Sequence, residues 1–357
     1  MTSLLTLLLT AAPWDSPTAG ANLFNEVETA ERLQAAAAAG FRVVRIAPDK
    51  WHGTGRDFLL GSADDYRGLP PEDLKRLRVV LDQAHAAGLK VVLTMLSLPG
   101  CRWKQHHGNE NDFRLYLEPK FQAQARTFWR DVAEVLHGHP ALAGYNLLNE
   151  PRPERDARTR TFDLNALYRS LVQGIREVDA TTPIILDGSD DASAEGLSRL
   201  TALEDANVLY AFHFYEPWPY IDHTTKGRFR YPGEVEGTTW NVEQVRRAMA
   251  RVVEWQKKNA VPASRIWLEE FGVPRTKPGA AAWLRDVLLV ASEQRWHWAV
   301  YSFREDTWDA MDYELGERPP SAAYWQARER GEKAVLERKP NALWKVILEH
   351  ARFRALP

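Results

Sequence analysis

Short apolar segments alternate with helical segments eight times along the 357-residue chain. Residues 41–47, FRVVRIA, are typical of a β-branched strand, and residues 141–148 have the continuous apolar pattern of a buried parallel strand. Two of the helical segments end at a glycine, Gly40 or Gly88, where a helix stops readily. The expected strands are residues 20–24, 41–47, 89–96, 141–148, 183–187, 208–214, 265–270 and 296–303.

The alternation predicts a single α/β domain over residues 1–357, with a motif-bearing core at 20–304 and C-terminal helices to 357. Eight strand–helix units joined by right-handed crossovers form a (β/α)8 TIM barrel, here with long loops after strands three, six and eight. A doubly wound open sheet is the alternative, but no glycine-rich phosphate-binding turn follows the first strand. The expected helices are residues 26–39, 71–87, 118–137, 162–178, 192–203, 242–259, 279–293, 321–337 and 341–352.

An acid follows the fourth expected strand, where residues 141–151 are ALAGYNLLNEP. A carboxylate at the end of a buried strand is costly to keep dry, so it normally faces a cleft. Pro151 ends the strand and begins a loop. Glu150 is therefore a candidate site residue, although the Asn-Glu-Pro motif alone is equally compatible with a solvated carboxylate.

In a barrel, chemistry gathers at the carboxyl ends of the strands, and a second acid, Glu270, ends the seventh strand. A double-displacement glycosidase needs such a pair, one carboxyl protonated to assist the leaving oxygen and one ionised to attack the anomeric carbon. The two carboxyls of a retaining enzyme lie about 5–5.5 Å apart. Asn149 is placed to hydrogen-bond the sugar 2-hydroxyl. The other notable residues at strand ends are Arg45, His213, Tyr215, Tyr301 and Phe303.

The seventh strand offers two consecutive acids, and strand periodicity distinguishes between them. Leu268 and Glu270 share one face of the strand, whereas Trp267 and Glu269 share the other. We therefore expect Glu270 at the barrel mouth and Glu269 in the outer layer.

Four segments, FRVVRI, YNLLNEP, YAFHFYEP and WLEEFG, occur in this order on the second, fourth, sixth and seventh strands. Together they resemble glycoside hydrolase family 5, the large cellulase family of retaining barrel glycosidases. The resemblance implies Glu150 as acid/base and Glu270 as nucleophile, with Arg45 and Tyr215 supporting the nucleophile. It also implies a contact of His213 near the acid/base, and no metal or organic cofactor.

The chain departs from the family pattern at two positions. The third strand, VVLTMLSLPG, lacks the histidine that family members usually have at its end, so His106 or His107 from the following loop is a candidate replacement. Tyr301 occupies the place of a tryptophan platform on the eighth strand. We expect both changes to alter substrate choice and to leave the two-carboxylate chemistry intact.

Fourteen tryptophans and eleven tyrosines suit either a large core or the binding of flat sugar faces. Trp103, Trp218 and Trp308 fall in expected loops on the active-site side, so we predict that they line sugar subsites. His106 and His107 are not expected to bind a metal, because adjacent histidines project differently and no third ligand has suitable spacing.

The formal net charge of −2 gives no reason to expect binding to nucleic acid or to an anionic membrane. The single cysteine, Cys101, allows no disulfide within this sequence and has no catalytic motif around it. Residues 1–15 contain an apolar run that is too short to span a bilayer and lacks a preceding basic region. A secretory signal is therefore not favoured, and a cytoplasmic location is preferred to a secreted one.

The expected function is a retaining β-glycoside hydrolase acting on a β-linked glucan or oligosaccharide. Long loops can wall off a cleft, which favours short β-linked oligosaccharides over polymer. The alternatives are an endo-β-1,4-glucanase or mannanase acting on polymer, and a barrel that binds carbohydrate without cleaving it. The presence of both acids argues against the last, since a binding module has no use for a paired acid and nucleophile.

Overall fold

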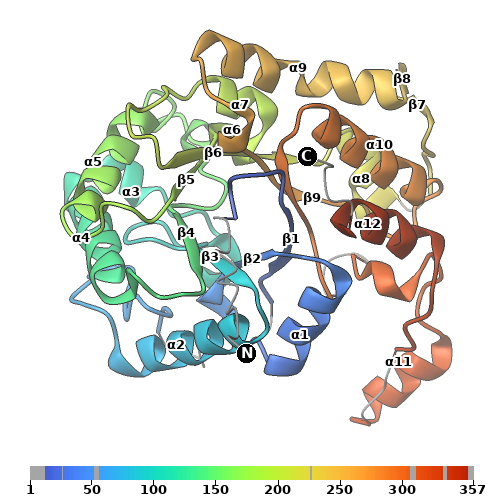
Figure 1. Cartoon of the computed structure of the whole chain (residues 1–357), viewed down its shortest axis with the longest axis horizontal. Helices are drawn as coiled ribbons and strands as arrows, with labels where there is room; N and C mark the ends of the chain where they lie inside the picture. Colours follow the sequence, from blue (N-terminus) through green and yellow to red (C-terminus); the bar gives the residue numbers. More distant parts are fainter. Residues whose placement is uncertain are drawn as a thin grey trace, which may run out of the picture.

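The computed structural model describes residues 13–25, 27–51, 56–225, 227–305, 311–332 and 336–352. Its parallel strands close into a barrel in the order β1-β10-β9-β6-β5-β4-β3-β2, with helices packed around it (Figure 1). The predicted (β/α)8 barrel is confirmed. The barrel strands are β1 (Ala19–Leu23), β2 (Val43–Ile46), β3 (Lys90–Thr94), β4 (Leu142–Asn146), β5 (Ile184–Asp187), β6 (Val208–Phe214), β9 (Ile266–Phe271) and β10 (His297–Val300).

Local signals in the sequence set several helix ends. The Asp163 side chain caps α5 by accepting a hydrogen bond from the backbone N–H of Ala166. Gly40 ends α1 with φ of 105°, a conformation that residues with a Cβ rarely adopt. The helices are α1 (Ala30–Ala39), α2 (Pro71–Ala86), α3 (Arg114–Leu117), α4 (Pro119–Leu136), α5 (Leu164–Arg176), α6 (Ser189–Ala192), α7 (Ala194–Ser198), α8 (Trp218–Ile221), α9 (Val242–Lys258), α10 (Ala280–Glu293), α11 (Ala322–Glu329) and α12 (Ala342–Arg352).

Some segments differ from the sequence-based expectation. The expected helix at 192–203 is replaced by α6 and α7, and Asp190 and Asp191 adopt left-handed φ angles of 54° and 55° where the chain turns. The expected helix at 321–337 is shorter, as α11. The aromatic loop after β6 contains α8 and an unexpected hairpin, β7 (Gly233–Val235) and β8 (Thr238–Trp240). No helix of the described part of the chain is long and apolar enough to cross a membrane.

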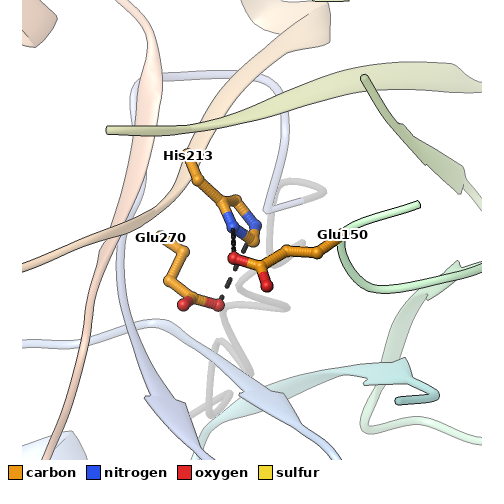
Figure 2. Close-up of side chains that lie close together, drawn as sticks. All are labelled: Glu150, His213 and Glu270. Carbon is orange, nitrogen blue, oxygen red and sulfur yellow. Dashed lines mark hydrogen bonds and ion pairs between the residues drawn. The ribbon is translucent and has the colours of Figure 1, made fainter. Parts of the chain in front are cut away.

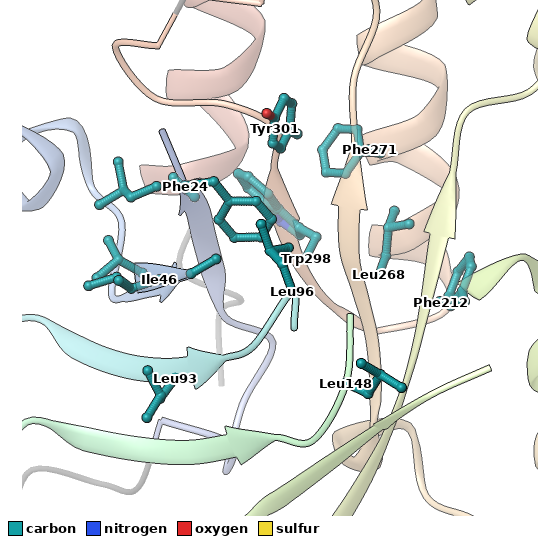
Figure 3. Close-up of a cluster of buried hydrophobic side chains, with 14 of the residues drawn as sticks. Phe24, Ile46, Leu93, Leu96, Leu148, Phe212, Leu268, Phe271, Trp298 and Tyr301 are labelled. Atoms are coloured by element: carbon teal, nitrogen blue, oxygen red, sulfur yellow. The ribbon is translucent and has the colours of Figure 1, made fainter. Parts of the chain in front are cut away.

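Apolar side chains fill the space on both sides of the barrel wall. Residues such as Ile46, Leu93 and Leu268 belong to the large core that packs against the helices (Figure 3). Trp14 closes the amino-terminal end of the barrel, where its Nε1 donates a hydrogen bond to the Ala143 carbonyl at 3.0 Å. The apolar cluster inside this end comprises Trp14, Val43, Val92, Ala143, Ile185, Leu209, Ala211, Trp267 and Ala299.

An irregularity in β9 decides where its two acids point. The register against β6 shifts between Leu268 and Glu270, so that Glu269 is an extra residue in β9. A bulge of this kind re-aims the side chains that follow it. Glu269 shares the interior face with Trp267, while Glu270 turns to the mouth. The expectation that Glu269 faces the outer layer is wrong, since its side chain is fully buried 3.3 Å from Nε of Arg45.

A buried histidine on β10 makes the stability of this fold depend on pH. Nδ1 of His297 accepts a hydrogen bond from the Thr18 N–H at 3.2 Å, and Nε2 donates to the Ser264 carbonyl at 3.0 Å. Burial lowers the pKa of His297 to about 4. A histidine in the unfolded chain has a pKa of about 6.5. The contribution of neutral His297 to the free energy of unfolding is therefore fully present above that pH and is lost as the pH falls towards about 4.

We expect His297→Gln to be less stable than the wild type at neutral pH but less sensitive to acid. Between pH 7 and pH 5 the variant should lose about 2 kcal/mol less of its free energy of unfolding than the wild type loses. Urea unfolding at pH 7 and pH 5 measures the loss of free energy of unfolding for the wild type and for the variant. His85→Gln, at an exposed position of α2, is the matched control and should keep the wild-type pH dependence. Equal losses in wild type and His297→Gln would contradict the prediction.

Candidate active site

Glu270 is held from two sides at the mouth of the barrel. Nη1 of Arg45 donates a hydrogen bond to its Oε2 at 3.0 Å, and the Tyr215 hydroxyl donates to its Oε1 at 2.7 Å. Both contacts favour an ionised carboxylate and fix its plane. Burial raises the pKa of Glu270, whereas His213 lowers it. Glu150 adds to the rise and Arg45 opposes it. The site therefore holds one oriented carboxylate under competing electrostatic influences.

Glu150 faces Glu270 from the loop after β4 (Figure 2). Its φ of 48° is a left-handed conformation that is strained for a residue with a Cβ. Its backbone N–H donates to Oδ2 of Asp187 at 3.1 Å, and its Oε1 lies 3.0 Å from Nδ1 of His213. One oxygen of each glutamate and one nitrogen of His213 lie within 4.8 Å of one another. The two carboxyls thus meet beside a shared histidine.

Arg45 is one of the polar side chains that fill the barrel interior beside Glu270. Its Nε and Nη2 donate to Oδ1 of Asn146 at 3.2 and 2.8 Å, and its Nη1 donates to Oδ1 of Asn22 at 3.2 Å. Nη2 also donates to Oδ1 of Asn149 at 2.8 Å. A buried guanidinium needs such partners, and they fix Arg45 beside Glu270. The polar layer, as we call it, comprises Asn22, Arg45, Thr94, Asn146, Asp187, His213 and Glu269.

Two cavities meet at Glu150. The larger, of about 840 Å³, extends over the loops after β4, β5 and β6 towards α9. The smaller, of about 330 Å³, contains Glu270 and extends over the loops after β1, β2 and β3. Four residues line both cavities: Glu150, Arg152, Tyr215 and Trp218. Trp218 is 58% exposed, so its ring is available to pack against a ligand.

The structure brings most of the predicted site residues to this mouth. Trp103, Asn149 and Tyr301 line the smaller cavity. The Tyr301 hydroxyl accepts a hydrogen bond from Nδ2 of Asn25 at 3.2 Å. The Arg152 guanidinium packs over the ring of Trp103, 5.0 Å from its centroid, and so supports one wall of the cavity.

Three predicted residues are not placed in the site. His106 and His107 do not line either of the two cavities, and Nδ1 of His107 lies instead 3.3 Å from the Glu110 carbonyl oxygen. Trp308 falls outside the described residues. At the end of the third strand the smaller cavity is lined by apolar Leu96. In the described structure, therefore, neither of these histidines replaces the one missing from that strand.

Four residues that reach the site were not among the predicted site residues. Lys50 and His223, from the loops after β2 and α8, line the smaller cavity. Asp187 and Glu269 are fully buried in the polar layer. Lys50, Asp187 and His223 lie in no recognised motif, whereas Glu269 lies in the WLEEFG segment but was expected in the outer layer. For Asp187 the only signal is its spacing of two from Ile185, which faces the barrel interior.

The acids of the site also approach one another as closely as metal ligands do. Within the described residues the ligating atoms lie within 4.8 Å in two groups, Glu150–His213–Glu270 and Asp187–His213–Glu269. The Arg45 guanidinium, however, already lies within 3.7 Å of three of these carboxylates. It supplies the positive charge that a cation would bring, and we do not assign these residues as metal ligands.

Two facing carboxyls at the carboxyl end of a (β/α)8 barrel, one held by Arg45 and Tyr215, define the site of a retaining glycosidase. The family model Cellulase (glycosyl hydrolase family 5) matches residues 12–307, and the chain belongs to this family. The chain is therefore a glycoside hydrolase that cleaves O-glycosyl bonds. The family resemblance in the four strand segments is confirmed.

Known proteins resemble the chain over most of its length. Endoglucanase C of Acetivibrio thermocellus is 24% identical over 326 residues, which cover 82% of this chain and 87% of that protein. A β-xylosidase of Phanerodontia chrysosporium is 24% identical over 266 residues, covering 69% of this chain and 51% of that protein. A solved glycoside hydrolase structure aligns with a TM-score of 0.71 at 19% identity, covering 94% of this chain and 99% of that one. A hyperthermophilic endo-β-1,4-glucanase in complex with substrate has a TM-score of 0.63 at 21% identity, covering 84% and 94%.

Proposed function

We propose that the enzyme hydrolyses β-linked glucan by double displacement, with Glu270 as the nucleophile and Glu150 as the acid/base. The main support is that oxygens of the two carboxyls approach within 4.8 Å in opposite surroundings. Glu270 accepts two hydrogen bonds that favour its ionised form. The Glu150 side chain is 18% exposed at the junction of the two cavities, where a leaving group can receive its proton. An inverting enzyme would need about 6.5–9.5 Å between the carboxyls.

The reaction takes two steps with the same residues. First, Glu270 attacks the anomeric carbon, the bond to the leaving oxygen breaks, and the proton of Glu150 passes to that oxygen. Water then attacks the same carbon, gives a proton to Glu150 and releases Glu270 as a carboxylate. Since Oδ1 of Asn149 is occupied by Arg45, its amide N–H groups are left to donate to a sugar hydroxyl.

The cavities favour cleavage within a chain over attack on short oligosaccharides alone. Sugar-binding space lies on both sides of Glu150, and the larger cavity is on the side away from Glu270. Trp218 lines both, so a glucan chain can pass over its exposed ring. The sequence-based preference for short substrates rested on the long loops after strands three, six and eight and on the two departures from the family pattern. A cavity of about 840 Å³ over the loops after β4, β5 and β6 nevertheless leaves room for a long leaving group. The endoglucanases among its relatives support the same substrate class.

A viscosity assay tests this proposal. We expect a soluble carboxymethylated or mixed-linkage β-glucan to lose viscosity quickly while few new reducing ends appear, since internal cuts shorten chains fastest. A β-mannan of similar length is the control for sugar identity and should be cleaved more slowly. Steady release of mono- or disaccharide at almost constant viscosity would contradict internal cleavage. Faster cleavage of the mannan would contradict the glucan assignment.

A further inference from the structure

Two buried acids of the polar layer have no place in the two-carboxylate mechanism. Asp187 and Glu269 come from β5 and β9, and both are fully buried. Three buried atoms have no hydrogen-bond partner of suitable geometry among the described residues: Oε1 and Oε2 of Glu269, and Nε2 of His213. Glu269 Oε1 nevertheless lies 3.4 Å from Nε2 of His213, and Oε2 lies 3.3 Å from Nε of Arg45. Burying an ionised carboxylate with so few hydrogen bonds costs free energy. A proton bound among these buried side chains would reduce that cost.

That proton fits best between the two acids. One carboxylate oxygen of Asp187 and one of Glu269 lie within 4.8 Å of each other. Two carboxyls at this separation repel each other strongly when both are ionised in a dry interior, so one takes up a proton and donates it to the other. Burial raises the pKa of Asp187 well above its usual range, and the neighbouring Glu269 raises it further. Burial acts on Glu269 in the same direction, but the positive charge of Arg45 and the hydrogen bond that a protonated Asp187 would donate outweigh it and lower the pKa of Glu269.

His213 lies between this pair and the reacting carboxyls. Its Nδ1 is 3.0 Å from Glu150, and its Nε2 is 3.4 Å from Glu269 and 3.8 Å from Glu270. Although burial lowers the pKa of His213, the surrounding negative charges raise it well above its usual value. The ionisable groups around His213 are Glu150, Asp187, Glu269, Glu270, Arg45 and, bonded to Glu270, Tyr215.

Charge balance shows what one shared proton achieves. Before reaction the proposed mechanism has Glu150 neutral and Glu270 negative. If the Asp187–Glu269 pair has one negative charge, the total negative charge of the pair and Glu270 is two. The positive charges of Arg45 and a protonated His213 then cancel it. After the first step Glu270 is a neutral ester and Glu150 has become the negative group. The buried cluster therefore stays neutral in both states, and the charge only moves from one side of His213 to the other.

We propose that Asp187 and Glu269 share one proton and act as a single negative charge that keeps His213 protonated throughout the reaction. This proposal rests on the acid and nucleophile roles proposed above. A protonated His213 donates through Nδ1 to Oε1 of Glu150, which leaves Oε2 to hold the proton for the leaving group. Its Nε2–H then donates towards Glu269. Both acids are thus positioning residues that act through His213.

The test compares the single variants Asp187→Asn and Glu269→Gln with the double variant. In each single variant the remaining acid ionises, so the pair keeps its one negative charge. Nitrogen NMR of ¹⁵N-histidine-labelled protein at neutral pH, with the His213 signal assigned from His213→Asn, should show a protonated ring in wild type and both single variants. The ring should be neutral in the double variant. A neutral ring in either single variant, or a protonated ring in the double, would overturn the proposal.

Infrared spectroscopy provides a second measurement that needs only the single variants. Wild type minus Glu269→Gln should show the band of one buried protonated carboxyl that the variant lacks, and Asp187→Asn should give the same difference. Absence of that band would overturn the shared proton. Activity on a poor leaving group should fall by about 10-fold or less in each single variant and by about 100-fold in the double. The spectra are recorded without turnover. They therefore test the shared proton independently of which glutamate is the nucleophile.

Discussion

Replacing Glu270 with glutamine is expected to lower kcat on the order of 10⁵–10⁶-fold, the scale reached when a covalent nucleophile is removed. The amide keeps nearly the same shape beside Arg45 and Tyr215, so substrate should still bind. It cannot form the ester to the anomeric carbon, so the covalent intermediate is lost. The loss should therefore be equally large for activated aryl glycosides and for β-glucan. Steady-state hydrolysis of both substrates measures it.

A matched control and a covalent trap make this result specific. Glu234→Gln, at an exposed position of β7, should keep wild-type activity. A 2-deoxy-2-fluoro β-glycoside with a good leaving group should label the wild type on the peptide that contains Glu270, and should not label Glu270→Gln. Labelling of another residue would refute the nucleophile assignment. Complete absence of turnover and labelling in the wild type would instead support a barrel that only binds carbohydrate.

The barrel could be predicted from sequence because its signals are local and repeated. Each strand is a short apolar segment, and helix ends are marked by residues such as Gly40, whose left-handed φ of 105° the structure confirms. Strand ends then locate the chemistry, because parallel strands bring their carboxyl ends to one mouth. Arg45, Glu150, His213 and Glu270 could therefore be placed together without knowledge of any side-chain contact.

The parts of the site that could not be predicted depend on register and on long loops. Trp267 and Glu269 share the barrel interior, as two-residue alternation requires, but the one-residue bulge turns Glu270 inward as well. Placing Glu270 at the mouth by alternation alone therefore put Glu269 on the wrong side of the barrel wall. Asp187 is the last residue of β5 and lies in no motif, yet its Oδ2 accepts a hydrogen bond from the backbone N–H of Glu150. His223 reaches the smaller cavity, and His106 does not, because of loop paths that no periodic pattern specifies.

Replacing Glu150 with glutamine is expected to separate the two steps of the reaction. On substrates with poor leaving groups, kcat/KM should fall by about 10²–10⁴-fold, the usual contribution of general acid catalysis. An activated aryl glycoside needs no proton for departure, so the ester to Glu270 should still form. Its hydrolysis should then stall, because no base remains to take the proton from water. Pre-steady-state release of the aryl group should show a burst followed by slow turnover, and a loss of the burst would contradict the assignment.

Azide tests the same assignment through stereochemistry. In Glu150→Ala, a small anion can occupy the vacated space and attack the ester without base catalysis, so added azide should restore aryl release. The ester to Glu270 is α-linked when the substrate is β-linked, and attack from the opposite face gives a β-glycosyl azide. If Glu150 were the nucleophile, its variant would instead react with azide directly at the β-linked substrate and give the α-azide. Proton NMR of the product distinguishes the two anomers, and an α-azide would reverse the roles of Glu150 and Glu270.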